Sequence, residues 1–440
     1  MRYFYKILFP FFLYSCALIL SACSSDDGDR LQGERIPITL EILSLNADEA
    51  LKDEKIYLPK PYKNINWPQR GGTADHAPQH LEFSGEFKEI WKRNIGDGNR
   101  GKLRISSQPI IINGVIYAMD ANYQISAITQ DTGAIIWQKS LERPKNDANS
   151  FGGGLTYARG KLFVTTGYGT VYSLDAEQGG NILWEYRTIT PIRSAPTVAN
   201  NILIIVTINN KAIALNAETA VPIWTHQGFE NASGIIGNSA PGIYDQLVVI
   251  PYSSGELYAL RLSNGRVLWQ QNLSTHSKFN ALSNISDISA LPILTSDYVI
   301  GFSHGGRLMK IEAATGAPLW DIKAGGVQTP WLAGNYLYVM TNSAQLMAVN
   351  TDNGLIKWVK QLPFWVDEDD QQEILHWQGP LLAGDKIFIA NQLKDGYFIS
   401  PYDGEILQNF KIPDSIATPP IVADGMMYIL YENADLIAYQ

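Results

Sequence analysis

The stretch that decides the fold is Ile125-Ser126-Ala127-Ile128-Thr129-Gln130-Asp131-Thr132-Gly133-Ala134-Ile135-Ile136-Trp137. It contains an apolar strand, a glycine turn and a second apolar strand that ends on tryptophan. Glycine supplies the positive φ that a tight turn needs, and the β-branched residues on both sides favour strands. The same unit recurs around Asn264-Gly265, Ala314-Thr315-Gly316 and Asn353-Gly354, each of which precedes a tryptophan. The chain is therefore built from a repeated β unit.

The number of units follows from the aromatic residues that close them, at positions 91, 137, 184, 224, 269, 320, 358 and 410. Neighbouring positions are 38 to 52 residues apart, which is the size of one four-stranded propeller blade. The last unit, Ile421 to Tyr439, has no closing tryptophan strand, whereas residues 87–95 form a closing strand with no unit before it. Pairing these two ends completes an eighth blade and removes an open sheet edge. The sequence predicts an all-β fold, one eight-bladed β-propeller of four-stranded blades over residues 87–440.

The repeated tryptophans have two possible roles, stacking on a ligand or packing between blades. A residue that recurs in every unit serves the unit, so packing between blades is the prediction. Most units open with a proline after a small or polar residue, as in Ala195-Pro196 and Thr418-Pro419. Proline at the first residue of a strand loses no ladder hydrogen bond, so we expect these pairs near the axis.

Composition excludes several classes of function. The formal net charge is −9, which disfavours a nucleic-acid partner because such partners are bound by clustered lysine and arginine. The two cysteines, Cys16 and Cys23, both lie near the N-terminus, so the repeats hold no disulfide, cysteine zinc site or catalytic thiol. The six histidines show no zinc-type spacing, and no nucleophile motif or phosphate loop is recognisable. We expect no metal, no cofactor and no enzyme activity.

Residues 1–22 have the pattern of an export signal, with Arg2 and Lys6 before an apolar run from Ile7 to Leu20. Leu20-Ser21-Ala22-Cys23 is similar to a lipobox, the site at which a lipoprotein precursor is cleaved and its cysteine acylated. The alternatives are an ordinary signal with a chance cysteine or an uncleaved anchor. Residues 23–86 then form an acidic tether and a non-repeating extension, with Trp67 as an expected anchor on the propeller. The expected location is the periplasmic face of the outer membrane, through a lipid on Cys23.

The repeated Ala-Leu, Thr-Gly and Trp pattern resembles the tryptophan-docking motif of the pyrroloquinoline-quinone propeller superfamily. That superfamily contains quinoprotein dehydrogenases and the BamB family of outer-membrane β-barrel assembly lipoproteins. The lipobox supports the BamB family separately, and Trp67-Pro68-Gln69-Arg70-Gly71-Gly72 looks like the N-terminal extension of its alphaproteobacterial members. The dehydrogenases typically carry vicinal cysteines and calcium-binding carboxylates at the axis, and the repeats of this chain contain no cysteine.

The resemblance to BamB implies a partner and a docking surface. In that family two neighbouring loops dock on the POTRA domains of the central barrel protein, BamA. The matching residues here are Ile235, Ile236 and Asn238 in the first loop and Asp287 and Ser289 in the second. The family's arginine in the first loop and the second aspartate of the Asp-x-Asp motif are absent. Ile235 and Ile236 either form an apolar knob or pack inward, and Asp287 either binds the partner or caps a turn.

The resemblance thus implies a non-catalytic scaffold of the barrel assembly complex, whose other lipoproteins and unfolded outer-membrane proteins are further partners. A rival function is a periplasmic quinoprotein-like enzyme, or a propeller that binds a cofactor or carbohydrate in its axial funnel. Several inward-facing aromatic residues at the axis would favour the rival, whereas small or unpatterned residues would favour the scaffold.

Overall fold

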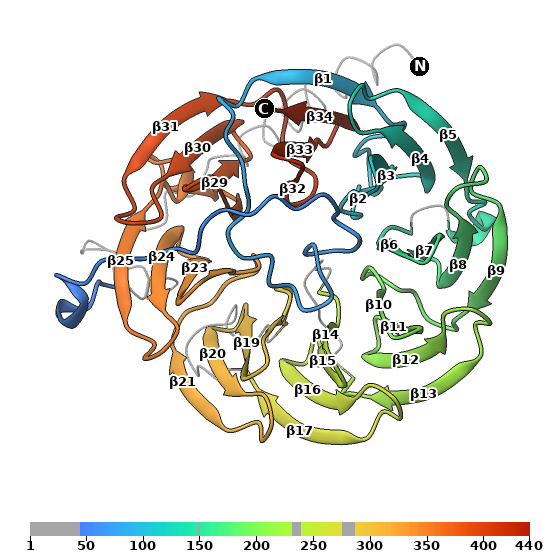
Figure 1. The fold of residues 1–440 in the computed structure, drawn as a ribbon, viewed down its shortest axis with the longest axis horizontal. Helices are drawn as coiled ribbons and strands as arrows, with labels where there is room; N and C mark the ends of the chain where they lie inside the picture. The colour runs from blue at the N-terminus through green and yellow to red at the C-terminus, as the bar shows by residue number, and fades with distance from the viewer. Residues whose placement is uncertain (1–44, 148–149, 231–238, 275–286) are drawn as a thin grey trace, which may run out of the picture. The chain divides into compact units, whose positions relative to one another are not determined.

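The computed structural model describes residues 45–147, 150–230, 239–274 and 287–440. Within these ranges the strands form eight four-stranded antiparallel sheets and one two-stranded hairpin. The eight sheets are arranged around a central axis as the blades of a propeller (Figure 1). The eight-bladed fold predicted from the spacing of the closing aromatics is confirmed.

Seven blades consist of four consecutive strands, numbered from the axis outward. The first four are β2 (Ile110–Ile112) to β5 (Ile135–Ser140) with β3 (Val115–Met119) and β4 (Gln124–Thr129); β6 (Gly153–Ala158), β7 (Lys161–Thr166), β8 (Thr170–Asp175) and β9 (Ile182–Arg187); β10 (Thr197–Ala199), β11 (Ile202–Val206), β12 (Lys211–Asn216) and β13 (Pro222–Gln227); and β14 (Gly242–Tyr244), β15 (Leu247–Pro251), β16 (Glu256–Arg261) and β17 (Val267–Asn272).

The next three blades continue in the same order. They are β18 (Ile293–Leu294), β19 (Tyr298–Ser303), β20 (Arg307–Glu312) and β21 (Pro318–Ile322); β22 (Trp331–Ala333), β23 (Tyr336–Met340), β24 (Gln345–Asn350) and β25 (Ile356–Gln361); and β28 (Trp377–Ala383), β29 (Lys386–Asn391), β30 (Asp395–Ile399) and β31 (Ile406–Lys411). The exposed hairpin of β26 (Trp365–Asp367) and β27 (Gln372–Ile374) is inserted before β28 and carries the acidic run 367–370.

The eighth blade is made from both ends of the repeat region. Strands β32 (Ile421–Ala423), β33 (Met426–Leu430) and β34 (Asp435–Tyr439) come from the C-terminus, and β1 (Glu89–Asn94) is the outermost strand. Antiparallel pairing places Glu89 opposite Tyr439 and Asn94 opposite Asp435. The predicted closure of the ring by the N- and C-terminal strands is confirmed.

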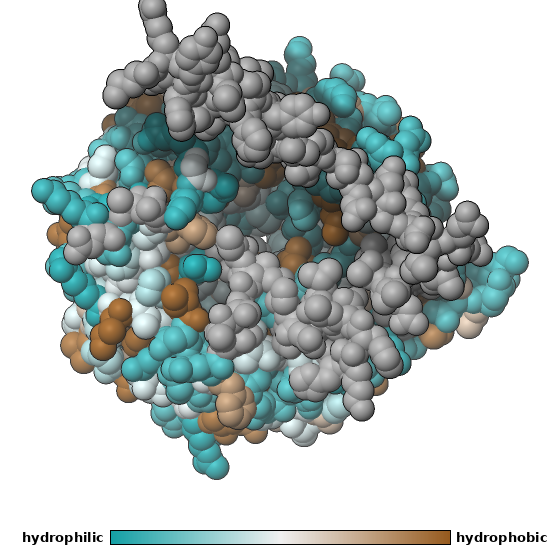
Figure 2. Space-filling model, turned by 180° about the vertical axis from the view of Figure 1, so that it is seen from behind, coloured by the Kyte–Doolittle hydropathy of each residue, from teal (hydrophilic) through white to brown (hydrophobic). Residues whose placement is uncertain are grey.

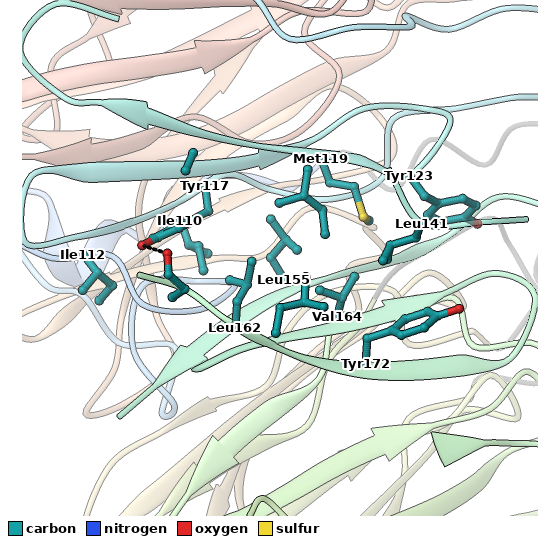
Figure 3. Close-up of a cluster of buried hydrophobic side chains, with 14 residues drawn as sticks. Ile110, Ile112, Tyr117, Met119, Tyr123, Leu141, Leu155, Leu162, Val164 and Tyr172 are labelled. Carbon is teal, nitrogen blue, oxygen red and sulfur yellow. Dashed lines mark hydrogen bonds between the residues drawn. The ribbon is translucent and has the colours of Figure 1, made fainter. Parts of the chain in front are cut away.

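The core lies between the faces of adjacent blades. In the cluster of Figure 3, side chains of β2 to β4 such as Ile110 and Met119 lie against side chains of β6 to β8 such as Leu155 and Val164. All four side chains are at most 1 % exposed. Alternating apolar residues therefore join one blade to the next, as expected for strands buried on both faces.

Seven of the eight seams between blades are fastened by an outer-strand tryptophan. Its indole N–H donates to a backbone carbonyl of the following blade. In six of these seams a turn glycine of the following blade lies against the indole, and in the Trp184 seam Ala220, with a φ of +61°, holds the turn position instead. The hydrogen bonds run from Trp91 to Gln130, Trp137 to Ala176, Trp184 to Ala217, Trp224 to Leu262, Trp269 to Ala313, Trp320 to Thr351 and Trp358 to Pro401, at 2.7 to 3.2 Å. The prediction that the tryptophans pack between blades is confirmed.

The eighth seam is built differently. In β31 the strand position equivalent to the docking tryptophan is Gln408, opposite Phe398, and Phe410 lies two residues further on. No turn connects β34 to β1, so this seam lacks the turn glycine that packs against an indole elsewhere. Phe87 fills the space instead, with its ring centroid 4.3 Å from that of Phe410 and 4.2 Å from that of Tyr439. An aromatic cluster thus replaces the tryptophan dock where the ring closes.

Candidate functional site

The non-repeating extension forms a strap around the axis of the propeller. The strap, residues 64–81, runs once around the central opening (Figure 1). Its contacts with the innermost strands are, in chain order, Asn64 Nδ2 to Val422 O of β32 (2.6 Å), Trp67 N to Ile111 O of β2 (2.7 Å), Tyr157 N of β6 to Pro68 O (2.8 Å), Val198 N of β10 to Gln69 Oε1 (3.2 Å), Ile243 N of β14 to Ala74 O (2.7 Å), Leu294 N of β18 to Asp75 O (2.8 Å), Trp331 Nε1 of β22 to Gln79 O (2.7 Å), and a bridge from Leu81 to Ala383 of β28. The strap therefore touches all eight blades in order.

Trp67 and the glycines after it shape the strap. The Trp67 side chain is 1 % exposed, so the expected anchor is present. Gly71 has a φ of +75°, and a Cβ on it would lie 2.8 Å from Leu291 Cδ1 and 2.9 Å from His76 Cδ2. Only glycine fits both the backbone conformation and this close approach. The sequence identified this segment but gave no sign of its circular path.

A cavity of about 50 Å³ remains at the axis beneath the strap. Trp67, Arg70 and His76 line it from the strap, and Gln108, Thr329 and Pro380 are among the residues that line it from the blades. The proline pairs of the sequence therefore do contribute to the axis, since Pro330, Pro380 and Pro419 all line the cavity. Seen from the opposite side, the molecule is hollowed at its centre (Figure 2).

Burial changes the pKa of both basic side chains in this cavity. Desolvation lowers the pKa of His76 to about 4 and that of Arg70 to about 10. At neutral pH the imidazole is therefore neutral and the guanidinium is charged.

In the part of the chain that the structure describes, no group of three or more His, Cys, Asp or Glu side chains is arranged to hold a metal ion.

The predicted docking residues divide into two groups. Cys23, Ile235, Ile236 and Asn238 lie outside the described residues. Asp287 and Ser289 are described, each 6 % exposed, and the backbone carbonyl of Asp287 accepts a hydrogen bond from His304 N at 3.0 Å. These positions define where the second loop joins blade β18–β21.

The two predicted loops meet at their bases. Ser239, the residue after Asn238, donates from its hydroxyl to the carbonyl of Ala290, the residue after Ser289, at 2.7 Å. Residues separated by about fifty positions in the sequence are thus in direct contact. The described ends of both loops lie at the entry to adjacent blades, β14–β17 and β18–β21.

The outer rim carries a second feature, which the sequence analysis missed. The outermost strand of most blades begins with exposed apolar residues, and its far edge has no partner strand among the described residues. Ile135, Ile182, Val267 and Ile406 occupy the same strand position and are 42 to 47 % exposed. The equivalent residue of β25, Ile356, is only 6 % exposed.

The chain's own residues 48–51 cover the β25 edge. Asp48 N donates to Ile356 O at 2.8 Å, and Ile356 N donates to Asp48 Oδ2 at 2.7 Å. Lys357 Nζ donates to the carbonyl of Leu51 at 2.6 Å, and the Leu51 side chain is buried. One rim edge therefore already accepts an additional segment of chain.

Among the described residues no helix is long and apolar enough to cross a membrane.

Comparison with known proteins places this propeller in a family. An uncharacterized protein of Rickettsia conorii is 34 % identical over 312 residues, which cover 69 % of this chain and 74 % of that protein. The outer membrane protein assembly factor BamB of Moranella endobia is 23 % identical over 391 residues, covering 87 % of this chain and 97 % of that protein.

Two solved structures share the fold. The crystal structure of BamB from Moraxella catarrhalis has a TM-score of 0.68 at 15 % identity and covers 80 % of this chain and 99 % of that chain. A europium-containing methanol dehydrogenase has a TM-score of 0.67 at 14 % identity, covering 83 % and 89 %. The family model described as outer membrane protein assembly factor BamB matches residues 121–360, more than half of the sequence. The chain therefore belongs to the BamB family.

Proposed function

We propose that this chain is a non-catalytic lipoprotein scaffold of the complex that assembles outer-membrane β-barrel proteins. The observation that carries the proposal is the family match over residues 121–360, together with relatives named as outer membrane protein assembly factors. Residues 1–22 serve as the signal peptide, and residues 23–86 connect a lipid on Cys23 to the propeller. The protein then works at the periplasmic face of the outer membrane.

Docking on the POTRA domains of a BamA-like barrel protein is assigned to the two neighbouring loops. Ile235, Ile236 and Asn238 supply an apolar contact from the first loop, and the region of Asp287 and Ser289 supports it from the second. The hydrogen bond between Ser239 and Ala290 supports this assignment, because it holds the bases of the two loops together. A docking surface built on one fixed base loses little conformational entropy when it binds.

Unfolded outer-membrane proteins are the second proposed partner, and the rim edges are where they bind. An extended segment adds to a sheet edge through backbone hydrogen bonds, and exposed apolar side chains beside the edge strengthen the contact. The segment around Asp48 supports an accessible edge, because it bonds to Ile356 of β25 through the Asp48 backbone N–H and the Asp48 carboxylate.

The rival function, a quinoprotein-like enzyme, is disfavoured by the axis. Trp67, Arg70, Gly71 and His76 of the strap line the axial cavity, whose volume is about 50 Å³. Pockets for ligands of cofactor size enclose roughly 300 Å³ or more. The structural likeness to methanol dehydrogenase extends to the fold and carries no activity.

The test is a pull-down of the lipidated full chain in mild detergent, read by mass spectrometry. The Ile235→Asp/Ile236→Asp variant removes the proposed docking contact, and Ile189→Asp/Ile208→Asp, at two exposed apolar residues outside the rim strands, is the matched control. We expect the barrel protein with its POTRA domains to be recovered with wild type and control, and lost with the loop variant. Recovery with all three would remove the loop assignment, and absence of any barrel partner would overturn the scaffold function.

Lipid anchoring is tested separately by Cys23→Ala. The variant should leave the membrane fraction and appear in the periplasmic extract, whereas Cys16→Ala should remain with the membrane. Equal distribution of both variants would contradict acylation of Cys23.

For the rim, a photo-crosslinking residue at Leu183 should capture unfolded barrel precursors. The same residue at Lys357, on the covered β25 edge, should not.

A further inference from the structure

The axial cavity contains a positive charge with no counter-charge. Arg70 is the one charged side chain among its sixteen lining residues, none of which is aspartate or glutamate. Within the described ranges Arg70 takes part in no ion pair or side-chain hydrogen bond. Arg70 is half-buried, and a charge that has lost part of its water without gaining a partner is costly, so proteins normally pair such a group. The cavity therefore lacks an anionic partner for the guanidinium.

His76 adds a second unsatisfied group to the same cavity. The residue is 3 % exposed, and its Nδ1 lies 2.8 Å from the carbonyl of Pro292. A carbonyl only accepts, so Nδ1 carries the proton and the neutral ring presents Nε2 as an acceptor. Nε2 is buried and has no hydrogen-bond partner within the described part of the chain. It therefore needs a donor.

The other polar side chains around the cavity are already engaged. Gln108 Oε1 accepts from Gly71 N at 3.0 Å and from Trp67 Nε1 at 3.4 Å, and its Nε2 donates to Pro419 O at 3.0 Å. Gln328 Nε2 donates to Trp377 O at 2.9 Å, and Thr329 Oγ1 accepts from Leu291 N at 3.0 Å. Gln108, Gln328 and Thr329 thus each make at least one hydrogen bond to the blades, whereas no hydrogen bond is found for the Arg70 guanidinium or for Nε2 of His76 within the described residues.

The two groups together specify the ligand. The guanidinium favours a negatively charged acceptor, and Nε2 of the neutral imidazole accepts from an O–H or N–H donor, so a protonated oxyanion satisfies both groups at once. We infer that the axial cavity binds a small oxyanion that still carries one proton, of the class of hydrogen phosphate or bicarbonate, between Arg70 and His76. A water molecule needs about 10–15 Å³ of such space, so a cavity of about 50 Å³ has room for an anion of a few atoms.

Sulfate provides the sharpest control for this inference. It has the shape and charge of hydrogen phosphate but carries no proton at neutral pH, so it can satisfy Arg70 and not Nε2 of His76. Chloride likewise offers no donor. The site should therefore prefer phosphate or bicarbonate to sulfate, because a buried acceptor left unpaired lowers affinity.

The experiment measures thermal unfolding and calorimetric binding of the full chain, purified free of phosphate and carbonate, at pH 7.5 and constant ionic strength. We expect phosphate or bicarbonate to raise the melting temperature saturably and to bind at least tenfold more tightly than sulfate or chloride. Separate titrations decide between the two oxyanions. Arg70→Gln should abolish the response, Arg70→Lys should retain part of it, and Arg104→Gln, at an exposed arginine, should leave it unchanged.

A crystal soaked in arsenate, which retains one proton, gives a readout that needs no variant. An anomalous peak between Arg70 and His76, absent after a selenate soak, would support the site. Equal responses to phosphate and sulfate, no response to any anion, or ordered water alone in the cavity would each overturn the proposal. The comparison of anions in the wild-type chain decides the matter even where the Arg70 variants fail to fold.

Discussion

Gly180, in the turn between β8 and β9, lies against the indole ring of Trp137 on the preceding blade. A Cβ built on Gly180 would be 2.8 Å from Cζ3 of that ring. The neighbouring Gly179 has the same φ of +70°, yet nothing lies within 4 Å of its Cβ position. Two adjacent glycines of one turn therefore separate the cost of backbone strain from the cost of crowding a tryptophan dock.

We expect Gly180→Ala to lower the free energy of unfolding by about 2–4 kcal/mol, from overpacking and positive φ together. Gly179→Ala carries only the conformational cost, about 1 kcal/mol. Denaturant unfolding followed by tryptophan fluorescence measures both. Equal losses in the two variants would show that the contact between Gly180 and Trp137 does not limit the packing of the seam.

Trp67 is expected to be the principal anchor of the strap. Truncation of a buried tryptophan to alanine costs roughly 3–5 kcal/mol, and Trp67→Ala also removes the Nε1 bond to Gln108. Trp365→Ala, on the hairpin of β26 and β27, should cost less than about 1 kcal/mol. Limited proteolysis should cut the strap of the Trp67→Ala variant first. Uncut strap and unchanged stability would contradict the anchoring role.

His76 makes stability depend on pH in a defined window. Burial lowers its pKa in the folded chain to about 4, against 6.5 in the unfolded chain. Between these values the unfolded chain binds a proton at this residue and the folded chain does not, so the free energy of unfolding falls as the pH falls. The contribution of the neutral His76 to the free energy of unfolding is fully present above pH 6.5. About 3 kcal/mol of that contribution is lost by pH 4.

The measurement compares wild type with His76→Gln, since glutamine can still donate to the carbonyl of Pro292 but does not titrate. Unfolding curves at pH 7, 6, 5 and 4 in phosphate-free buffer give the difference between the two proteins. That difference should change across this window and level off above it. A constant difference from pH 7 to pH 4 would show that His76 is not held neutral.

The covered β25 edge should be protected from hydrogen exchange by Asp48. Asp48→Ala removes the carboxylate that accepts from Ile356 N, so the Ile356 amide should exchange at least tenfold faster. Asp53→Ala, which alters an exposed aspartate of the same segment, is the control and should have no effect. Mass spectrometry of peptides that span β25 provides the measurement. Unchanged exchange at Ile356 would mean that residues 48–51 do not occupy the edge in solution.

The blades could be predicted because their signals repeat. A turn glycine and an outer-strand tryptophan recur at a near-constant distance in most blades, because both take part in the same contact between neighbouring blades. The eighth seam follows the same logic in reverse. No turn joins β34 to β1, so the eighth seam has no turn glycine. The spacing of closing aromatics predicts Phe410 at the docking position, and this prediction is wrong because Gln408 occupies it.

The strap and its cavity could not be predicted because they depend on non-repeating contacts. Residues 64–81 bond mainly through backbone atoms and single side chains, such as Ala74 O and Gln69 Oε1, which leave no periodic pattern. Arg70 and His76 are distinguished by what surrounds them rather than by their spacing. The covered edge of β25 was equally invisible, because Asp48 and Ile356 are separated by more than three hundred residues.

Repeat proteins usually gain and lose units readily, because each unit contacts only its neighbours. The strap changes this rule, since a single run of 18 residues passes around the ring and touches all eight blades in order. Duplication or deletion of one blade in the gene would leave this run too short or too long for its ring. The number of blades is therefore fixed by a segment outside the repeat. A change in the number of blades would have to be inherited together with a change in the length of the strap.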